Sequence, residues 1–299
     1  MIDVLIAGGG PAGLSAALIL GRCRRTVLLC DDGRQRNRSS RAINGLLGHD
    51  GDEPRAFLQR SRLQLDRYET VEQQTTTIDR ISREAGGFAF ACSNGARGIA
   101  RKVLLATGLT DELPSIPGIE QFYGTSVHHC LYCDGYECAG KTVVALGKGE
   151  RGVDLALMMK HWIGDVVYCA DGYPIDDVLA DKLARFGVRV RTEPIRGLVG
   201  ENGRLERLCL RDGADLACTA IFFSKGCSQT SKLAEQLGCE RDAKGGLLAM
   251  PLTEETSQTG VYAAGDASRD VLLVSIAIAE GAKAAVAINK AFLREEGLC

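Results

Sequence analysis

The chain has 299 residues, of which 45% are hydrophobic, and this is enough to bury a core in two domains of ordinary size. Its 36 basic and 38 acidic residues give a formal net charge of -2, so there is no excess of positive charge to bind a nucleic acid or an anionic membrane surface. We therefore expect a folded globular protein without a nucleic-acid or membrane partner.

The N-terminal region predicts a strand, a glycine-rich turn, a helix and a second strand. Residues 2–7 form an apolar run, GGGPAG follows at 8–13, an Ala/Leu-rich helix covers 14–20, and TVLLC at 26–30 predicts the next strand. This order is a βαβ unit. The apolar start has no basic leader and carries Asp3, which suits neither a signal peptide nor a membrane span, so a cytoplasmic location is expected.

The middle of the chain predicts a second unit of the same kind. After a polar loop, a helix is expected over 54–68, and strand-rich pieces run to KVLLATG at 102–108. The segment LTDELPSIPG at 109–118 predicts a linker, because it holds two prolines and a glycine. KTVVALG at 141–147, a helix over 153–162 and the strand DVVYC at 165–169 then repeat the N-terminal organisation.

The last part of the chain returns to the first unit. Further strand-rich pieces and a helix around 233–237 precede AKGGLLAMP at 243–251, which predicts a second crossover. GVYAAGDAS at 260–268 and a closing helix over about 271–293 follow. The order of elements predicts an α/β protein with two Rossmann-like domains of the three-layer ββα type.

The first glycine fingerprint consists of Gly8, Gly10 and Gly13, placed where a strand turns into a helix. Glycines at this spacing permit a tight turn, bring backbone N–H groups close to a pyrophosphate and let the helix pack on the strand. Asp31 lies 18 residues beyond Gly13, at the end of the second strand, where a carboxylate can accept ribose hydroxyls. The alternative is a glycine-rich packing turn without a ligand.

The second fingerprint consists of Gly147, Gly149 and Gly152, with Asp171 nineteen residues further on. An enzyme that uses NADPH needs Arg or Lys after the second strand to hold the 2′-phosphate. Residues 161–181 contain neither, and they carry five aspartates. This loop disfavours NADPH, and it leaves NADH, or a nucleotide fold that binds no nucleotide, as alternatives.

The segment HHCLYCDGYEC at 128–138 allows three interpretations. His128 or His129 could bind zinc together with Cys130, Cys133 and Cys138, but no second CxxC or HxxxH pair exists to complete a typical structural site. The cysteines could also be inert core residues. The third interpretation is a redox dithiol, which a CxxC in a dinucleotide-binding protein favours.

The redox interpretation places Cys130 and Cys133 at the N-terminus of a helix, where the dipole favours a thiolate. Asp134 is then a candidate acid/base residue, or alternatively a carboxylate that stabilises the helix start. His128 and His129 are expected to be packing or surface residues. No metal site is expected, and the remaining cysteines are expected to be reduced and structural; Cys299 could be a shuttle thiol, but an incidental exposed thiol is favoured.

The motifs occur in the order seen in one family. GGGPAG with its acid, LLATG, CxxCDG, the second fingerprint and GVYAAGDAS before a final helix resemble the low-molecular-weight thioredoxin reductases. The likeness covers essentially the whole chain. DDGRQRN, GLLGHDG, LPSIPG and CxYCDGYE resemble a branch that includes thioredoxin-reductase-like proteins and the flavin dithiol oxidases that form epidithiol natural products, without the NADPH 2′-phosphate motif.

The resemblance implies FAD as cofactor, a homodimer, and a second domain inserted into the first. It implies an FAD-binding domain of residues 1–114 and 248–299 and a CxxC-containing, pyridine-nucleotide-binding-like domain of residues 115–247. By the resemblance, Cys133 faces the flavin and Cys130 attacks the partner disulfide. The residues implied in cofactor binding are Gly8, Gly10, Pro11, Ala12, Gly13, Asp31, Thr107, Gly108, Gly265, Asp266, Ile276 and Ala277.

Three functions are compatible with these residues. The first is a thiol–disulfide oxidoreductase that moves two electrons between FAD and Cys130–Cys133 and then a thioredoxin-like protein or a small disulfide, with NADH or a protein as electron donor rather than NADPH. In the second, electrons run from a substrate dithiol through the CxxC pair and FAD to dioxygen. The third is a flavin redox sensor without turnover.

Overall fold

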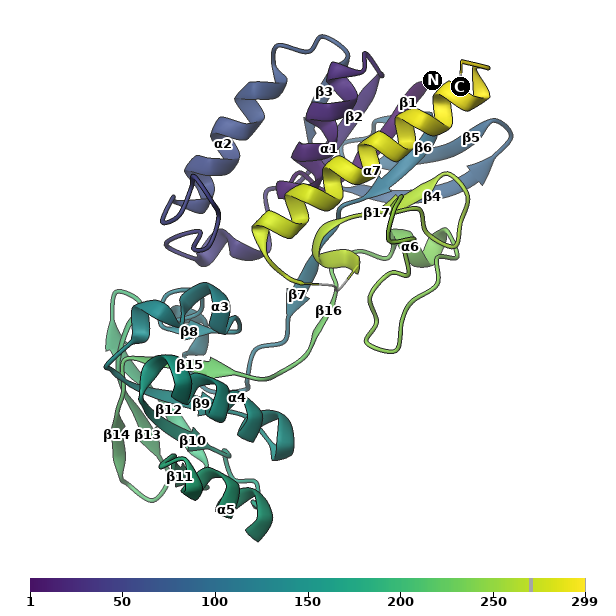
Figure 1. The fold of residues 1–299 in the computed structure, drawn as a ribbon. Coiled ribbons are helices and arrows are strands. Elements are labelled where there is room, and N and C mark those ends of the chain that lie inside the picture. The colour runs from purple at the N-terminus through teal and green to yellow at the C-terminus, as the bar shows by residue number, and fades with distance from the viewer. Residues whose placement is uncertain (269–270, 299) are drawn as a thin grey trace.

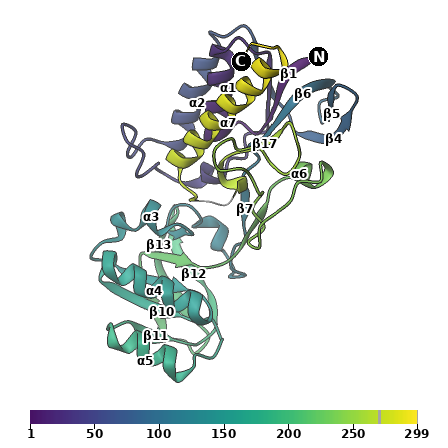
Figure 2. The same cartoon turned by 45° about the vertical axis from the view of Figure 1, so that its right-hand side comes forward.

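The protein is described from a computed structural model that covers residues 1–268 and 271–298. Figures 1 and 2 show two lobes, one above the other, connected by two strands. The N-terminus and the end of the described chain lie together in the first lobe. The α/β class with two Rossmann-like sheets is confirmed.

The first lobe is built on a sheet in the order β3-β2-β1-β6-β5-β4, and β17 pairs with β6. Pairing is parallel from β3 to β6 and at β17, and antiparallel among β4, β5 and β6. The strands are β1 (Ile2–Ala7), β2 (Val27–Asp31), β3 (Val71–Thr75), β4 (Ile78–Glu84), β5 (Gly87–Cys92), β6 (Arg97–Leu105) and β17 (Val261–Ala263).

Helices and the antiparallel strands cover opposite faces of the parallel strands. The helices of this lobe are α1 (Pro11–Arg22), α2 (Pro54–Leu65), α6 (Leu233–Gln236) and α7 (Val274–Glu295), with 3-10 turns η1 (Arg36–Ser39) and η4 (Gly265–Ser268). Along β1, Val4 and Ile6 pack under α1 and α7, whereas Leu5 packs toward β4 and β5. This alternation produces the three-layer ββα arrangement.

The long helix α7 lies beside α1 in both ribbon views. Gly281 permits this approach, because a Cβ atom at this position would lie 2.1 Å from the carbonyl oxygen of Ala12. Ser15 donates a hydrogen bond to the backbone oxygen of Ile278 at 2.7 Å. The close packing holds the start of α1, and with it the glycine turn, against the final helix.

The second lobe repeats the plan with the order β11-β10-β9-β15-β8, all parallel, and a separate antiparallel sheet β12-β13-β14. The strands are β8 (Val127–His128), β9 (Thr142–Leu146), β10 (Asp165–Cys169), β11 (Arg189–Arg191), β12 (Ile195–Glu201), β13 (Arg204–Leu210), β14 (Asp215–Ala217) and β15 (Ala220–Phe223). The helices are α3 (Leu131–Asp134), α4 (Gly149–Ile163) and α5 (Asp177–Arg185), with η2 (Ile119–Gln121) and η3 (Tyr136–Cys138).

The chain leaves the first lobe through β7 (Leu109–Asp111) and returns through β16 (Cys227–Gln229), which pair antiparallel. The second lobe is therefore inserted into the first. The return lies earlier than the expected boundary at residue 248, because Leu233, Cys239 and Leu247 belong to the core of the first lobe. The strand β16 is too short to give a periodic sequence signal.

Helix limits differ from expectation at several ends. Helix α2 ends at Leu65 rather than at residue 68, α4 begins at Gly149 rather than at 153, and α7 covers 274–295 rather than 271–293. Helix α5 was not predicted from the sequence at all. Its N-terminus is capped by Asp176, whose side chain accepts a hydrogen bond from the backbone of Leu179 at 2.8 Å.

Candidate active site

A cavity of about 460 Å³ lies between the two lobes and joins the first glycine fingerprint to the CxxC segment. The glycine turn lines it from one lobe, and the CxxC segment lines it from the other. The expected site residues that line it are Gly8, Gly10, Pro11, Ala12, Asp31, Thr107, Gly108, Cys130, Cys133, Asp134, Gly265, Asp266 and Ala277. Gly13 and Ile276 are not among the lining residues.

The three glycines of the first fingerprint have separate structural causes. Gly8 has a φ of +106°, and a Cβ there would lie 2.2 Å from the carbonyl oxygen of Ala106. Gly13 lies behind the turn, where a Cβ would be 1.9 Å from the oxygen of Gly8. Gly10 instead borders open space, because the atom nearest to a Cβ at this position would be 3.9 Å away, on Gln35. Only Gly10 therefore leaves room for something other than protein.

Asp31 is buried at the end of β2 and lines the cavity. Its Oδ1 accepts a hydrogen bond from the backbone N–H of Gly9 at 2.9 Å, and its Oδ2 accepts from Gln35 at 2.8 Å and from Arg62 at 2.5 Å. Among residues 1–268 and 271–298, this N–H is the single donor to Oδ1, and a carboxylate oxygen can accept two hydrogen bonds. The carboxylate is thus held in place and retains capacity for a ribose hydroxyl.

The cavity fits the FAD that the family implies. Helix α1 begins at Pro11 without a side-chain cap, so its first N–H groups point at the turn without a side-chain partner. These groups, Gly10 and the partial positive charge of the helix start form an anion site suited to a pyrophosphate. The methyl group of an Ala at position 10 would occupy part of this space, so the turn has the shape of a ligand-binding site.

The redox interpretation of the CxxC segment matches the structure, where Cys130 and Cys133 form a disulfide. Cys130 is the N-cap of α3, and its sulfur accepts a hydrogen bond from the backbone N–H of Cys133 at 3.1 Å. Helix α3 is only four residues long, so a thiolate formed on Cys130 would be stabilised by this hydrogen bond rather than by a helix dipole. Sulfurs joined in this way do not coordinate zinc.

Among the other described cysteines, the free thiols include Cys23, Cys30, Cys92, Cys138, Cys169, Cys209, Cys218 and Cys239. Cys138, the third cysteine of the segment, is buried, and burial raises its pKa to about 11. It is therefore protonated near neutral pH and is not a nucleophile. Cys30 and Cys92 approach each other with sulfurs 3.9 Å apart, and burial raises the pKa of both. Cys299 lies outside the described residues.

Asp134 follows the disulfide directly and lies next to a buried histidine. Its Oδ2 is 3.3 Å from Nδ1 of His128. His128 is buried on β8 and packs against the ring of Phe222, with ring centroids 5.1 Å apart. The expectation of a packing residue is confirmed for His128, with the addition that its ring also contacts the candidate acid/base residue.

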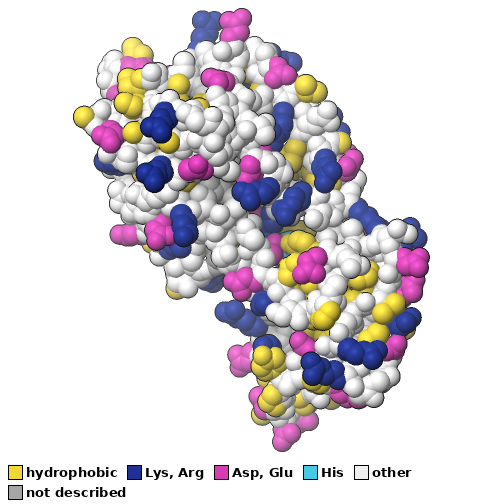
Figure 3. Space-filling model, turned by 180° about the vertical axis from the view of Figure 1, so that it is seen from behind, with side chains coloured by type: hydrophobic (Ala, Val, Ile, Leu, Met, Phe, Trp, Pro, Cys, Tyr) yellow, Lys and Arg dark blue, Asp and Glu magenta, His cyan; other side chains and the backbone are white. Residues whose placement is uncertain are grey.

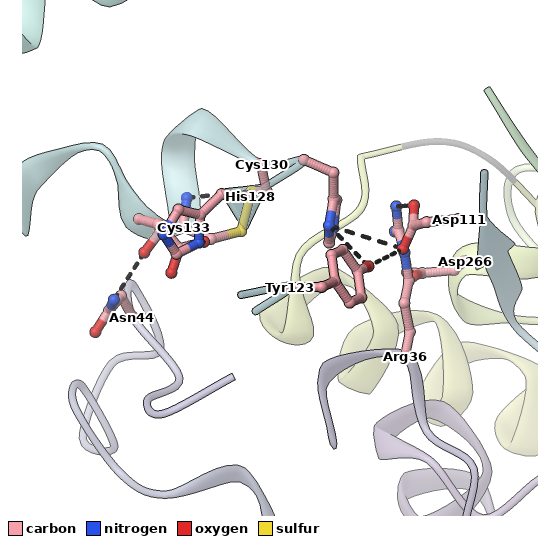
Figure 4. Close-up of a disulfide and its surroundings, with 10 residues drawn as sticks. Arg36, Asn44, Asp111, Tyr123, His128, Cys130, Cys133 and Asp266 are labelled. Carbon is pink, nitrogen blue, oxygen red and sulfur yellow. Dashed lines mark hydrogen bonds and ion pairs between the residues drawn. A yellow bond between two sulfur atoms is a disulfide. The ribbon is translucent and has the colours of Figure 1, made fainter. Parts of the chain in front are cut away.

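A polar network reaches the cavity beside Cys130 and joins both lobes (Figure 4). Arg36, from η1, donates to Asp111 at 2.6 and 2.8 Å and to Asp266 at 2.9 Å. The hydroxyl of Tyr123 donates to Asp111 at 2.6 Å and lies 3.2 Å from Nδ1 of His129. Asp111 belongs to β7, so the network is centred on one of the two crossover strands.

Burial and charge shift the pKa values in this network in different directions. Burial acts to raise the pKa of Asp111, but the hydrogen bonds of Arg36 and the charges around it outweigh burial and hold that pKa below its usual range. Burial and the Asp111 hydrogen bond raise the pKa of the Tyr123 phenol. Burial, helped by Arg36, lowers the pKa of His129. At neutral pH the network therefore holds a carboxylate, a neutral phenol and a neutral imidazole.

The two lobes also touch through the loop that follows η1. Nδ2 of Asn44 donates a hydrogen bond to the backbone oxygen of Cys133 at 2.7 Å (Figure 4). Arg41 donates to the backbone oxygen of Asn202 at 3.1 Å. These contacts hold the disulfide toward the glycine turn of the first lobe.

The glycines of the second fingerprint allow a strand and a helix to pack closely. A Cβ on Gly147 would lie 2.6 Å from the Cα of Gly152, so the strand and helix α4 pack closely there. However, Oδ1 of Asp171 accepts a hydrogen bond from the backbone of Ile195 at 2.8 Å. The ammonium group of Lys148 lies 3.2 Å from the ring centroid of Tyr173, just after β10. Asp171 and Lys148, the acid and the base next to the second fingerprint, thus already interact with other groups of the protein.

Charges of both signs are interspersed on the face shown in Figure 3, and no patch of one sign extends across it. In the ranges 1–268 and 271–298, no helix is long and apolar enough to cross a membrane. Within the same ranges, no group of three or more His, Cys, Asp or Glu side chains is arranged to hold a metal ion.

Several residues of this site were not predicted from the sequence: Arg36, Asn44, Asp111 and Tyr123. Arg36 and Asn44 lie in or next to the segments DDGRQRN and GLLGHDG, which carried a family resemblance but no assigned chemistry. Asp111 lies in the predicted linker. None has a spacing signal, because the residues come from separate segments of the chain. His129 was expected to be a packing or surface residue, and its place in the network is a further finding of the structure.

Comparison with known proteins agrees with this geometry. The model of the pyridine nucleotide-disulphide oxidoreductases matches residues 2–281. The thioredoxin reductase tcpT of Claviceps purpurea is 30% identical over 279 residues, covering 89% of this chain and 86% of its own. Among solved structures, TrxB of Bacillus anthracis is 31% identical with a TM-score of 0.94, covering 99% of this chain and 100% of its own.

An oxidoreductase of Agrobacterium tumefaciens is 34% identical with a TM-score of 0.90, covering 98% of this chain and 99% of its own. The likeness therefore extends over both lobes and over the way they are joined. The chain belongs to the pyridine nucleotide-disulphide oxidoreductase family and is a flavin disulfide oxidoreductase of the thioredoxin reductase type.

Proposed function

We propose that the protein exchanges two electrons between FAD and the Cys130–Cys133 pair and passes them on by thiol–disulfide exchange with a partner. The observation that carries this proposal is that the disulfide and the first glycine turn line one cavity. Gly8, Gly10, Pro11, Ala12 and Asp31 would hold the pyrophosphate and ribose end of FAD.

Other predicted residues would hold the remainder of the cofactor. Thr107, Gly108, Gly265, Asp266 and Ala277 line the cavity between the glycine turn and the disulfide. Ile276 precedes Ala277 in the first turns of α7, and Gly13 supports the glycine turn from behind. Bound FAD supplies the capacity to accept or donate an electron pair.

The cysteines would act in sequence. In the dithiol state, the Cys130 thiolate attacks the partner disulfide, a Cys130–partner disulfide forms and one partner thiolate leaves. Cys133 then attacks the sulfur of Cys130, which restores the Cys130–Cys133 disulfide and releases the second partner thiolate. The partner gains two electrons and the pair loses two. Asp134, in the same cavity wall, is the proposed source of a proton for a leaving thiolate.

The electron source is proposed not to be NADPH. Residues 161–181 offer no Lys or Arg to a 2′-phosphate, and Asp171 and Lys148 already interact with Ile195 and Tyr173. NADH or a protein electron carrier would then reduce the flavin. The same observation supports a second candidate function, in which a substrate dithiol reduces the Cys130–Cys133 disulfide and the electrons leave through FAD to dioxygen.

The partner is proposed to be a thioredoxin-like protein or a small disulfide or dithiol, and the protein is proposed to be a homodimer. The likeness to a thioredoxin reductase of Claviceps purpurea supports a thioredoxin-like partner. The branch proposed for this chain, that of thioredoxin-reductase-like proteins without an NADPH 2′-phosphate motif, leaves room for a small dithiol.

Anaerobic reduction of the FAD-loaded protein tests this proposal. NADPH, NADH and a dithiol are added in separate cuvettes, and the flavin absorbance is followed. Bleaching by NADH supports the reductase with a changed donor. Bleaching by the dithiol alone, followed by oxygen consumption in air, supports the oxidase. Rapid bleaching by NADPH overturns the inference drawn from the acidic loop. If none of the three bleaches the flavin, a protein electron carrier is added next, and no bleaching by the carrier either overturns the proposed turnover.

A further inference from the structure

Helix α7 carries a carboxyl group on the face that it buries in the first lobe. Ala277, Glu280, Gly281 and Ala284 are all buried, and their spacing places them on one face of the helix. The other three residues are small and apolar. Burial of a polar group in such a setting is unfavourable unless the group is hydrogen-bonded. The carboxyl group of Glu280 therefore needs partners within the protein.

Glu280 contacts the turn η4 through one of its carboxyl oxygens. Its Oε2 accepts a hydrogen bond from the backbone N–H of Gly265 at 2.6 Å, and the hydroxyl oxygen of Ser268 lies 3.3 Å from Oε2. Gly265 is itself buried and is the first residue of η4. The first N–H groups of a helical turn have no partner within the turn, and a buried N–H without a partner is costly. Glu280 thus satisfies the first donor of η4 from the neighbouring helix.

The turn η4 presents Gly265 and Asp266 to the cavity. Gly265 has a φ of +74°, and a Cβ there would lie 3.0 Å from the Cβ of Ala12 and 3.6 Å from that of Ala277. The turn is therefore packed between the starts of α1 and α7. Oδ2 of Asp266 accepts a hydrogen bond from Arg36 at 2.9 Å (Figure 4). Because a carboxylate accepts at both oxygens, Arg36 does not exhaust the capacity of Asp266.

The residue after Asp266 is anchored separately. The backbone oxygen of Ala267 accepts hydrogen bonds from the backbone of Leu247 at 2.9 Å and from the side chain of Gln229 at 2.8 Å. These contacts hold Ala267, whereas Glu280 holds Gly265. Asp266 therefore lies between two residues that are fixed from different parts of the first lobe.

We propose that Glu280 is a positioning residue for FAD, whose carboxyl group fixes Gly265 and so directs Asp266 toward the bound cofactor. The inference rests on the proposed role of this cavity as the FAD site. Glu280 itself is not among the described residues that line the cavity. It acts through Asp266 rather than by touching the cofactor.

Hydrogen–deuterium exchange tests the contact between Glu280 and Gly265. The exchange of the peptide that contains Gly265 is followed by mass spectrometry in the protein as purified. Glu280→Met keeps a long side chain without an oxygen, and it should accelerate exchange of the Gly265 amide about tenfold, because a buried hydrogen bond is lost. Glu280→Gln retains an acceptor oxygen and should exchange within about twofold of the unaltered protein. Equal exchange in Glu280→Met and Glu280→Gln would overturn the inference.

Glu280→Asp is the second variant, for use if Glu280→Met does not fold. Its carboxyl group is one methylene shorter and falls short of the Gly265 N–H from the same backbone position. Exchange of the Gly265 amide should again be accelerated, by about fivefold. Exchange equal to that of the unaltered protein would contradict the proposed hydrogen bond.

The release of FAD tests whether Glu280 acts through Asp266. The holoprotein is diluted, and the FAD that leaves it is measured by the rise in flavin fluorescence. Glu280→Met and Asp266→Ala should each release FAD about tenfold faster than the unaltered protein. The double variant should stay within about twofold of Asp266→Ala, because Glu280 then has no side chain left to position. Effects that multiply to about a hundredfold would mean that Glu280 acts independently of Asp266, and would contradict the positioning role.

Glu295→Met is the matched control. Glu295 is the last residue of α7 and pairs with Arg101 and Lys102, so this change removes a carboxyl group from the same helix at its other end. Exchange of the Gly265 amide and release of FAD should both remain as in the unaltered protein. Equal acceleration in Glu295→Met and Glu280→Met would trace the effect to a general loosening of α7 and overturn the inference.

Neither measurement requires turnover. If no donor, dithiol or protein carrier reduces the flavin but Glu280→Met accelerates exchange and FAD release, the proposed electron transfer fails and the assignment of Glu280 stands. If turnover is observed while Glu280→Met changes neither exchange nor FAD release, the assignment of Glu280 fails alone.

Discussion

Asn44 and Cys133 are joined across the two lobes by a hydrogen bond of 2.7 Å from the side-chain amide to the backbone oxygen. Asn44 lies in the loop after η1, and Cys133 is the second cysteine of the redox pair. The contact therefore ties the position of the disulfide to the lobe that carries the glycine turn, without involving either sulfur.

Asn44→Ala should weaken the arrangement in which the disulfide faces the cavity. A hydrogen bond of this kind contributes about 1 kcal/mol, which corresponds to a shift of roughly fivefold in an equilibrium between two lobe arrangements. The measurement is single-molecule energy transfer between one dye on each lobe. Asn94→Ala removes an amide within the first lobe and is the control. Equal distributions for Asn44→Ala and the unaltered protein would show that other contacts hold the lobes.

Two glycine substitutions should separate cofactor binding from folding. Gly13→Ala places a Cβ within 1.9 Å of the Gly8 oxygen and should lower the free energy of unfolding of the FAD-free protein by about 2–3 kcal/mol. Gly10→Ala has open space and should leave that free energy unchanged but reduce the FAD retained after purification. Urea unfolding measures the change in the free energy of unfolding of each variant. The ratio of the flavin absorbance at about 450 nm to the protein absorbance at about 280 nm measures the FAD that each variant retains. A full FAD content in Gly10→Ala would contradict the assignment of this segment to the pyrophosphate site.

The cysteines of the segment 128–138 should differ sharply in function. Cys130→Ser and Cys133→Ser should each abolish disulfide turnover, since each removes one sulfur of the redox pair. Cys138→Ser should retain turnover within about twofold, because a buried thiol whose pKa is raised to about 11 supplies almost no thiolate near neutral pH. The measurement is steady-state disulfide reduction or dithiol oxidation. Turnover that survives in either redox-pair variant would contradict the assignment.

Asp111→Asn should destabilise the protein in a pH-dependent way. The change leaves Arg36 with one carboxylate, that of Asp266, and should lower the free energy of unfolding by about 3 kcal/mol at pH 7. The folded-state pKa of Asp111 lies below its usual value, so its contribution is complete above the unfolded value of about 3.9. This contribution to stability is lost as the pH falls from the unfolded value through the pKa of Asp111 in the folded protein.

Urea unfolding curves at about pH 7, 5 and 3 check this direction of the pH dependence. The difference between Asp111→Asn and the unaltered protein should be equal at the two higher values and smaller at the lowest. Asp79→Asn, on β4 outside the network, is the control. A difference that grows on acidification would mean that Asp111 is not an ionised partner of Arg36 in the folded state.

Local patterns predicted much of this fold. The two βαβ units, the glycine turns and the final helix were identified because each depends on residues close in sequence, where hydrophobic period and glycine spacing are directly readable. Helix α5 was missed, although Asp176 offered an N-cap signal and the helix is amphipathic, because it is short and only its Leu183 is buried. The early return at Cys227 was missed because it depends on pairing with Leu109–Asp111, more than a hundred residues away.

The sequence by itself determined the fold class, the two nucleotide-type turns and the redox nature of Cys130 and Cys133, because these follow from short-range spacing and residue chemistry. Only the tertiary structure decided that the disulfide faces the first turn, and that Asp111 gathers Arg36, Tyr123 and His129 around it. Arg36 and Asp266 are 230 residues apart in the chain, yet their side chains are 2.9 Å apart. Contacts of this range arise from the packing of the two lobes, and no local pattern in the sequence encodes them.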